Sequence, residues 1–127
     1  MRVLIADDDR DLCQLLAHYV RECGHEVVET VSGGGLAAIR SFAQHDPDLV
    51  FLDLTMPQLS GATACRQMLS RKPAARIIFV TGVLDNLHAK VTHCHAAGAV
   101  RKPFNLEDVR AMLERCALPA ESKCQAA

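Results

Sequence analysis

The short apolar run Leu49–Leu52 constrains the fold of this chain more than any other stretch. A run of this length is too short for a buried helix, and its Val, Phe and Leu residues are typical of strands. Apolar runs without polar alternation belong to strands that are buried on both faces, as they are inside a parallel sheet. Arg2–Ala6 and Arg76–Thr81 have the same character. These runs are therefore predicted to be the central strands of a parallel sheet.

Segments with helical periodicity separate the strands. Leu16 and Val20 recur at helical spacing and would share one buried face of a helix at residues 10–23. The same periodicity predicts helices at residues 36–45, 61–71, 85–97 and 106–116. In the first of these, Leu36, Ile39, Ala43 and the nearby Phe42 are expected to face inward.

Two weaker runs complete the pattern: a more polar strand at residues 26–29, expected near a sheet edge, and a brief one at residues 98–101. A strand followed by a helix, five times over, predicts an α/β fold with right-handed crossovers. For one domain of this size we expect a flavodoxin-like, doubly wound, five-stranded parallel sheet in the order 2-1-3-4-5, with helices on both faces. The domain is expected to span residues 1–117, with residues 118–127 as a disordered tail.

Composition argues against several function classes. The formal net charge is −1, which gives no electrostatic reason to expect nucleic acid or an anionic membrane as a partner. No apolar stretch reaches the roughly 18 residues that a membrane-spanning helix needs. The amino terminus also lacks a signal-peptide pattern. A cytoplasmic location is therefore expected.

The six cysteines are scattered and form no C-x-x-C pair, so we expect reduced thiols that pack as small apolar side chains. His93, Cys94 and His95, with His88 upstream, raise the alternative of a metal site. Adjacent helical residues point in different directions, and helical ligands need spacings of three or four. The spacing therefore favours a helix flank over a metal site.

Reactive side chains come directly after the predicted strands. Asp7 and Asp8 follow the first, Asp53 ends the third, Thr81 ends the fourth, and Lys102 follows the fifth. In a doubly wound sheet these positions share one end of the molecule. Clustered carboxylates repel unless a cation neutralises them, and oxygen ligands select Mg²⁺, or Mn²⁺, over zinc. A hydroxyl and an ammonium suit phosphoryl oxygens, and a carboxylate can accept a phosphoryl group. The pattern predicts Mg²⁺-assisted phosphoryl transfer onto an aspartate.

Four motifs follow one another along the chain: A-D-D-D from Ala6, F-L-D-L-T-M-P from Phe51 with Gly61 beyond it, V-T-G from Val80, and K-P-F from Lys102. In this order they resemble the response-regulator receiver domain. The resemblance covers residues 2–116. Each motif alone is weak evidence, but together they lie at the expected strand ends.

The resemblance implies that Asp53 is the phosphoacceptor and receives its phosphoryl group from a histidine of a sensor kinase or a phosphotransfer protein. It implies Mg²⁺ bound by Asp8, Asp53 and the backbone carbonyl of Thr55, with Asp7 acting through water. Thr81 and Lys102 would contact the phosphoryl oxygens, and Lys102–Pro103 would be a cis peptide. A downstream protein target, or an output domain outside this chain, would respond, with the receiver as a monomer or weak dimer.

The sequence also departs from the family. Receivers usually carry Tyr or Phe three residues before the lysine, and here that position is Ala99. Compared with other receivers, the strand at residues 98–101 is expected to be shortened, and the segment between Thr81 and Gly98 is a little long. We therefore expect the signal to pass through residues 83–95, without an aromatic side chain that changes rotamer.

Two other functions are carried as alternatives. A degenerate receiver could act as a constitutive protein-binding module. An enzyme of another class is less well supported. A haloacid-dehalogenase-type phosphatase would need a second aspartate where Thr55 stands, and a flavin carrier would need more aromatic residues than Tyr19 and four Phe. The chain is expected not to be an enzyme, apart from gaining and losing its own phosphoryl group.

Overall fold

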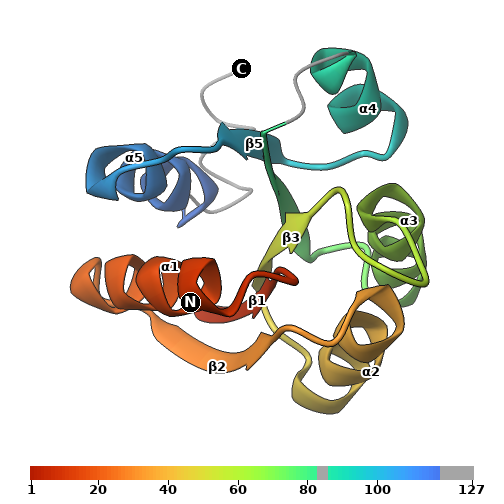
Figure 1. Cartoon of the computed structure of the whole chain (residues 1–127), viewed down its shortest axis with the longest axis horizontal. Coiled ribbons are helices and arrows are strands. Elements are labelled where there is room, and N and C mark those ends of the chain that lie inside the picture. Colours follow the sequence, from red (N-terminus) through yellow and green to blue (C-terminus); the bar gives the residue numbers. More distant parts are fainter. Residues whose placement is uncertain (83–85, 118–127) are drawn as a thin grey trace.

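The computed structural model describes residues 1–82 and 86–117 and confirms the predicted α/β fold. All strands are parallel, in the order β2-β1-β3-β4-β5 (Figure 1). The strands are β1 (Arg2–Ala6), β2 (Glu26–Val31), β3 (Leu49–Asp53), β4 (Arg76–Thr81) and β5 (Gly98–Arg101). The helices are α1 (Arg10–Glu22), α2 (Gly35–His45), α3 (Gly61–Arg71), α4 (Leu87–His93) and α5 (Leu106–Ala117). The tail expected at residues 118–127 lies outside the described residues.

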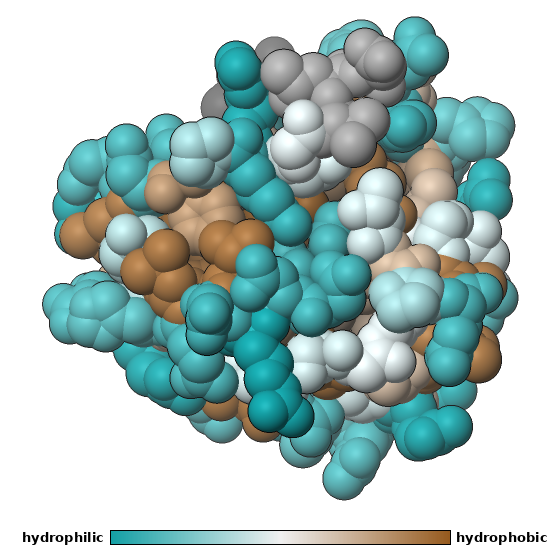
Figure 2. All heavy atoms as spheres, viewed as in Figure 1, coloured by the Kyte–Doolittle hydropathy of each residue, from teal (hydrophilic) through white to brown (hydrophobic). Residues whose placement is uncertain are grey.

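Successive strand side chains pack into two separate cores, one on each face of the sheet. Phe51 and its neighbours in the sheet pack with α1 and α5. Leu52 and its neighbours pack with α2, α3 and the end of α4. Every residue of β3 is buried, as a central parallel strand requires, whereas the polar strand β2 lies at an edge, as expected. Figure 2 shows apolar side chains gathered on one face of the molecule, where α1 and α5 lie side by side.

Local signals in the sequence fix the helix ends next to the sheet. The Asp9 side chain caps α1 by accepting from the backbone N–H groups of Asp11 and Leu12, at 3.0 and 3.2 Å. Asn105 and Asp108 form a reciprocal cap at the start of α5, in which each side chain accepts from the other's backbone N–H, at 2.9 and 3.0 Å. The starts of α1 and α5 are therefore held close to the strand ends that precede them.

Two expectations about helices were wrong. The helix expected at residues 85–97 is α4, which ends at His93, because Cys94 caps it and His95 takes a left-handed backbone with φ of 59°. Residues 83–85 lie outside the described part of the chain. In α2, Leu36 is 52% exposed and Ala43 is exposed, so neither faces inward, while Phe42 is buried as predicted and Ile39 is half-buried.

Most cysteines are free thiols in the two cores. Cys13, Cys65, Cys94 and Cys116 are buried, and Cys23 is half-buried. Cys124 lies outside the described residues. None of the described helices has both the length and the apolar character to cross a membrane.

Candidate functional site

Asp53 is the centre of the site. It is the last residue of β3, in the middle of the sheet, and only 2% of it is exposed. Its Oδ1 accepts hydrogen bonds from the backbone N–H of Thr55 at 3.1 Å and from the Thr55 hydroxyl at 3.3 Å. The chain passes very close behind it, because a Cβ on Gly61 would collide with the Asp53 carbonyl oxygen. The side chain is thus held in one orientation at the carboxyl end of the sheet.

Two further carboxylates come from the loop after β1. Asp7 is 4% exposed, and its Oδ1 accepts from the backbone N–H of Asp9 at 2.9 Å. Asp8 is exposed. One carboxylate oxygen from each of Asp7, Asp8 and Asp53 lies within 4.8 Å of the other two. In the described part of the chain this is the only such cluster of potential metal ligands, and the histidines around Cys94 form none.

Lys102 supplies the cation that faces this cluster. Its Nζ lies 2.8 Å from Asp7 Oδ2 and 3.5 Å from Asp53 Oδ2. Burial acts to lower the pKa of Lys102, but the Asp7 and Asp53 carboxylates outweigh it, so the pKa is raised and the ammonium stays charged. The peptide Lys102–Pro103 is cis, as the resemblance implied.

The charge on Asp53 is only partly balanced. Burial raises its pKa to about 6, and the nearby Asp7 and Asp8 carboxyl groups add to this effect. The Thr55 backbone N–H and the Lys102 ammonium act in the opposite direction. The site therefore holds more negative charge than Lys102 offsets, which is the condition under which a divalent cation is attracted.

The two threonines complete the set of predicted residues. Thr81 ends β4, and its backbone carbonyl accepts from the Lys102 N–H at 2.9 Å. It is 1% exposed, and the neighbouring Val80 pairs with Asp53 across the sheet. Thr55 is exposed on the loop after β3. The structure thus gathers Asp7, Asp8, Asp53 and Lys102 in one cluster, with both threonines at its border.

Cys13 is a neighbour of the site that the sequence did not reveal. Its Sγ donates to the Asp7 carbonyl oxygen at 3.2 Å, and burial raises the pKa of the thiol to about 11. Such a thiol stays protonated and acts as a buried donor beneath the Asp7 backbone. Helical spacing can show that a residue at this position is buried, but it cannot show this contact.

Comparison with known proteins identifies the family. The family model of the response regulator receiver domain matches residues 3–114. The chain is 29% identical over 120 residues to the chemotaxis protein CheY of Listeria monocytogenes, covering 92% of this chain and 98% of that protein. It is 31% identical over 113 residues to the transcriptional regulatory protein PdtaR of Mycobacterium tuberculosis, covering 89% of this chain and 55% of that protein.

A solved structure agrees with these matches. The crystal structure of a response regulator receiver domain protein from Clostridium thermocellum gives a TM-score of 0.82 at 25% identity, covering 99% of this chain and 98% of that one. The family match spans most of the chain and includes the whole acidic cluster and Lys102. The chain therefore belongs to the response regulator receiver domain family and is a CheY-like receiver of two-component signalling.

Proposed function

We propose that this receiver is a phosphorylation switch in which Asp53 accepts a phosphoryl group from a histidine of a sensor kinase or a phosphotransfer protein. The phosphorylated form then changes its affinity for a downstream protein or output domain. The observation that carries the proposal is the placement of Asp53, a buried carboxylate 3.5 Å from an ammonium and beside two further carboxylates. This arrangement places a nucleophile and its charge-stabilising groups together at the carboxyl end of the sheet.

The chemistry uses the two Asp53 oxygens differently. Oδ1 is held by Thr55, so Oδ2, the oxygen near Lys102, forms the new bond to phosphorus. The bond from phosphorus to the histidine nitrogen breaks, and its electron pair stays on the imidazole. Lys102 and the Thr81 hydroxyl then contact phosphoryl oxygens. Hydrolysis reverses the modification when water attacks phosphorus, releases inorganic phosphate and restores the carboxylate. The chain thus acts on its own phosphoryl group, not on a separate substrate.

The acidic cluster fits a bound Mg²⁺, or Mn²⁺. Its donors are all oxygens, which these ions prefer, and three of them lie within 4.8 Å of one another. Asp8, Asp53 and the backbone carbonyl of Thr55 would hold the ion, with Asp7 acting through water. When bound, the ion would neutralise charge on the carboxylates and on the incoming phosphoryl group.

Intact-mass measurement tests the proposal. Wild-type protein treated with acetyl phosphate and Mg²⁺ is expected to gain the mass of one phosphoryl group, and Asp53→Asn none. Chelation of the divalent ion is expected to prevent the gain. A wild-type protein that gains no mass would instead support the constitutive binding module, and a modified Asp53→Asn protein would move the acceptor elsewhere.

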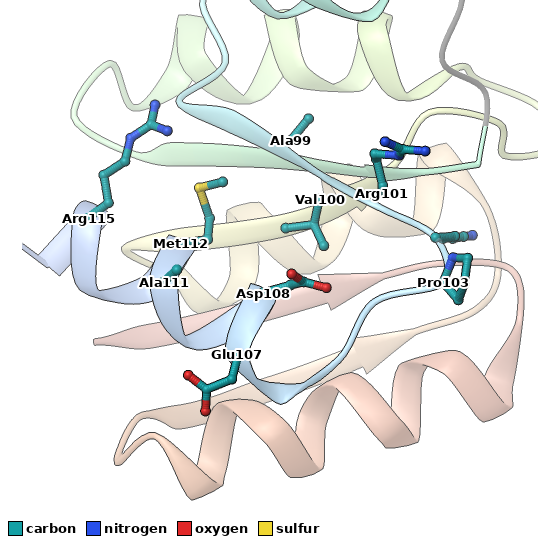
Figure 3. Close-up of a pocket in the computed structure, with 10 residues that line it drawn as sticks. Ala99, Val100, Arg101, Pro103, Glu107, Asp108, Ala111, Met112 and Arg115 are labelled. Atoms are coloured by element: carbon teal, nitrogen blue, oxygen red, sulfur yellow. The ribbon is translucent and has the colours of Figure 1, made fainter.

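The path of the signal to a partner follows from Ala99 and α4. Ala99 is half-buried and points away from α5, whereas Val100 points toward it (Figure 3). Ala99 has no ring that could move when Thr81 moves. The α4 helix is short and has no buried residue, so it is the helix least fixed by packing. We infer that α4 and the residues beside it carry the change.

Hydrogen exchange with beryllofluoride as the phosphoryl mimic tests this path. Amide exchange is expected to change chiefly in residues 83–95, of which 86–95 belong to the described part of the chain. Smaller changes are expected at residues 99–101. Changes confined to the loops at Asp8, Asp53 and Lys102 would show that the modification does not reach α4.

A further inference from the structure

A hollow with an apolar floor and a cationic rim lies at the amino end of the sheet, opposite the acidic cluster. It has a volume of about 360 Å³ and lies between the end of α3, the start of β4 and the residues after α4. Leu69, Ala75 and Cys94 contribute apolar atoms to it, and Arg66 and His95 contribute charged or titratable ones. It is thus built to take an apolar group next to an anionic one.

A second hollow adjoins the first. It measures about 440 Å³ and shares Pro73, Ala75 and His95 with the first, while Arg76 and Arg115 add further positive charge. In Figure 3, Pro103 precedes the start of α5, near the acidic cluster, and Arg115 lies at the other end of that helix. None of the described residues that line the two hollows is acidic. We name the two together the basal groove.

The basal groove lies in a part of the chain that is poor in acidic residues. Between Asp53 and Glu107 the sequence has a single acidic residue, Asp85. The cations in the same stretch are Arg66, Arg71, Lys72, Arg76, Lys90, Arg101 and Lys102. The net charge of −1 for the chain therefore hides a positively charged stretch of sequence, to which Arg66 and Arg76 at the basal groove belong.

Two side chains on the rim are available to a ligand. Arg66 is exposed on α3, and no carboxylate in residues 1–82 or 86–117 pairs with it. Arg115 is held at the groove, because its Nη2 donates to the Ala97 carbonyl oxygen at 2.7 Å. His95 is exposed and keeps a left-handed backbone with φ of 59°, a conformation that favours glycine over larger residues. Arg66 and Arg115 therefore present positive charge at the two hollows that flank the apolar floor.

We propose that the basal groove binds an acidic segment of a partner protein, with carboxylates at Arg66 and Arg115 and an apolar side chain over Leu69. The surface lies away from Asp53, so this binding does not depend on the proposed phosphorylation. Nucleic acid fits less well, because His95 is the only aromatic ring among the described lining residues, whereas proteins that bind single strands stack successive bases on several aromatic side chains. A compact apolar hollow between cations favours a peptide.

Fluorescence anisotropy with labelled synthetic peptides tests this proposal. A peptide of alternating glutamate and leucine is expected to bind. Peptides with glutamine in place of glutamate, or serine in place of leucine, are expected to bind roughly tenfold more weakly, a difference of about 1.4 kcal/mol. Arg66→Glu is expected to reduce binding of the first peptide by a similar factor. Amide chemical shifts should change at residues 66–75 and 94–97.

The matched control is Arg40→Glu, which reverses an exposed charge on α2 and is expected to leave peptide binding unchanged. His95→Gly removes a rim side chain while keeping the left-handed backbone accessible, so it tests the groove without threatening the fold.

Equal loss of peptide binding in Arg66→Glu and Arg40→Glu, or equal binding of all peptides, would overturn the proposal. Tighter, Arg66-dependent binding of a labelled oligothymidine would replace the peptide with nucleic acid. Phosphoryl uptake by Arg66→Glu should equal that of the wild type, which separates this test from that of Asp53.

Discussion

The two ends of the sheet both carry networks of charged side chains, but in different surroundings. At the carboxyl end, Asp7 and Asp53 are 4% and 2% exposed and share Lys102. At the amino end, Lys72 pairs with Asp46 and Asp48, whose side chains are 74% and 51% exposed. Exposed pairs are screened by water and contribute little, whereas buried charges must be balanced by each other. Burial, not the number of ion pairs, therefore decides which end can be reactive.

The amino-end network works mainly through hydrogen bonds to the backbone. The backbone N–H of Arg2 donates to Asp48 Oδ2 at 2.8 Å, and Arg2 Nη1 donates to the Asp46 carbonyl at 3.1 Å. Lys72 Nζ donates to the carbonyls of Asp46 and Pro47 at 3.2 and 3.0 Å. These bonds join the start of β1, the loop before β3 and the end of α3. They connect these three segments without bringing several buried carboxylates together, as the carboxyl end does.

The largest effect is expected when the half-buried Lys102, the cation shared by Asp7 and Asp53, is removed. Lys102→Met leaves Asp7 and Asp53 without their shared partner, so we expect a loss of about 3 kcal/mol in the free energy of unfolding at pH 7 without metal. The loss should shrink below pH 6, where Asp53 takes up a proton. Urea denaturation at several pH values measures it. A loss that does not change with pH would mean that Lys102 acts through packing alone.

Asp53→Asn removes the charge of Asp53 instead, and we expect it to raise the free energy of unfolding, whereas Lys102→Met lowers it. The folded pKa of about 6 lies above the ordinary value of 3.8, so the charged carboxylate destabilises the metal-free protein above pH 6. The amide oxygen of asparagine can still accept from Thr55. We expect a gain on the order of 2 kcal/mol at pH 7, falling toward zero as the pH drops from 6 to 4. Thermal or urea unfolding across that range measures it, and a gain that persists at pH 4 would contradict the charge explanation.

The strand ends were predictable from the sequence because each buried run stops at a polar residue, and parallel strands bring those stops to one end. The predicted cluster of Asp7, Asp8, Asp53 and Lys102 is confirmed as a set of neighbours. Its internal geometry was not predictable, since spacing along the chain does not show that Lys102 lies closer to Asp7 than to Asp53.

The helices show what hydropathy alone misses. In α2, a Cβ on Gly35 would collide with Leu59, so this helix packs against the loop after β3 through a residue with no side chain. That contact turns Ala38 and Phe42 inward and leaves Leu36 outside. The end of α4 was predicted too late in the chain, because the left-handed residue after the helix is His95 and not the glycine that usually marks a helix end in a sequence.

Asp8 is the exposed member of the acidic cluster. Asp8→Ala removes a direct ligand, so Mg²⁺ affinity should fall at least about tenfold, while the metal-free fold becomes slightly more stable as carboxylate repulsion is relieved. Titration calorimetry measures the affinity. Asp11→Ala is the control, because it removes an exposed carboxylate from the first turn of α1 that does not belong to the cluster. Equal affinity in wild type and Asp8→Ala would contradict the assignment of Asp8 as a ligand.

The smallest effect is expected at the amino end, from Asp46→Asn. The pair between Lys72 Nζ and Asp46 Oδ1 spans 3.3 Å, but the Asp46 side chain is 74% exposed. Asp46 caps α2 in the left-handed region at φ of 49°, which asparagine tolerates as well as aspartate does, and its carbonyl still accepts from Lys72. We expect a change below about 0.5 kcal/mol in the free energy of unfolding, and less in high salt. Asp46→Ala removes the same charge but places alanine at positive φ, where roughly 1 kcal/mol of backbone strain is expected. Urea denaturation of both variants separates charge from backbone. If Asp46→Asn alone cost well over about 1 kcal/mol, the exposed ion pair would be a substantial source of stability, and the contrast between the two ends of the sheet would not hold.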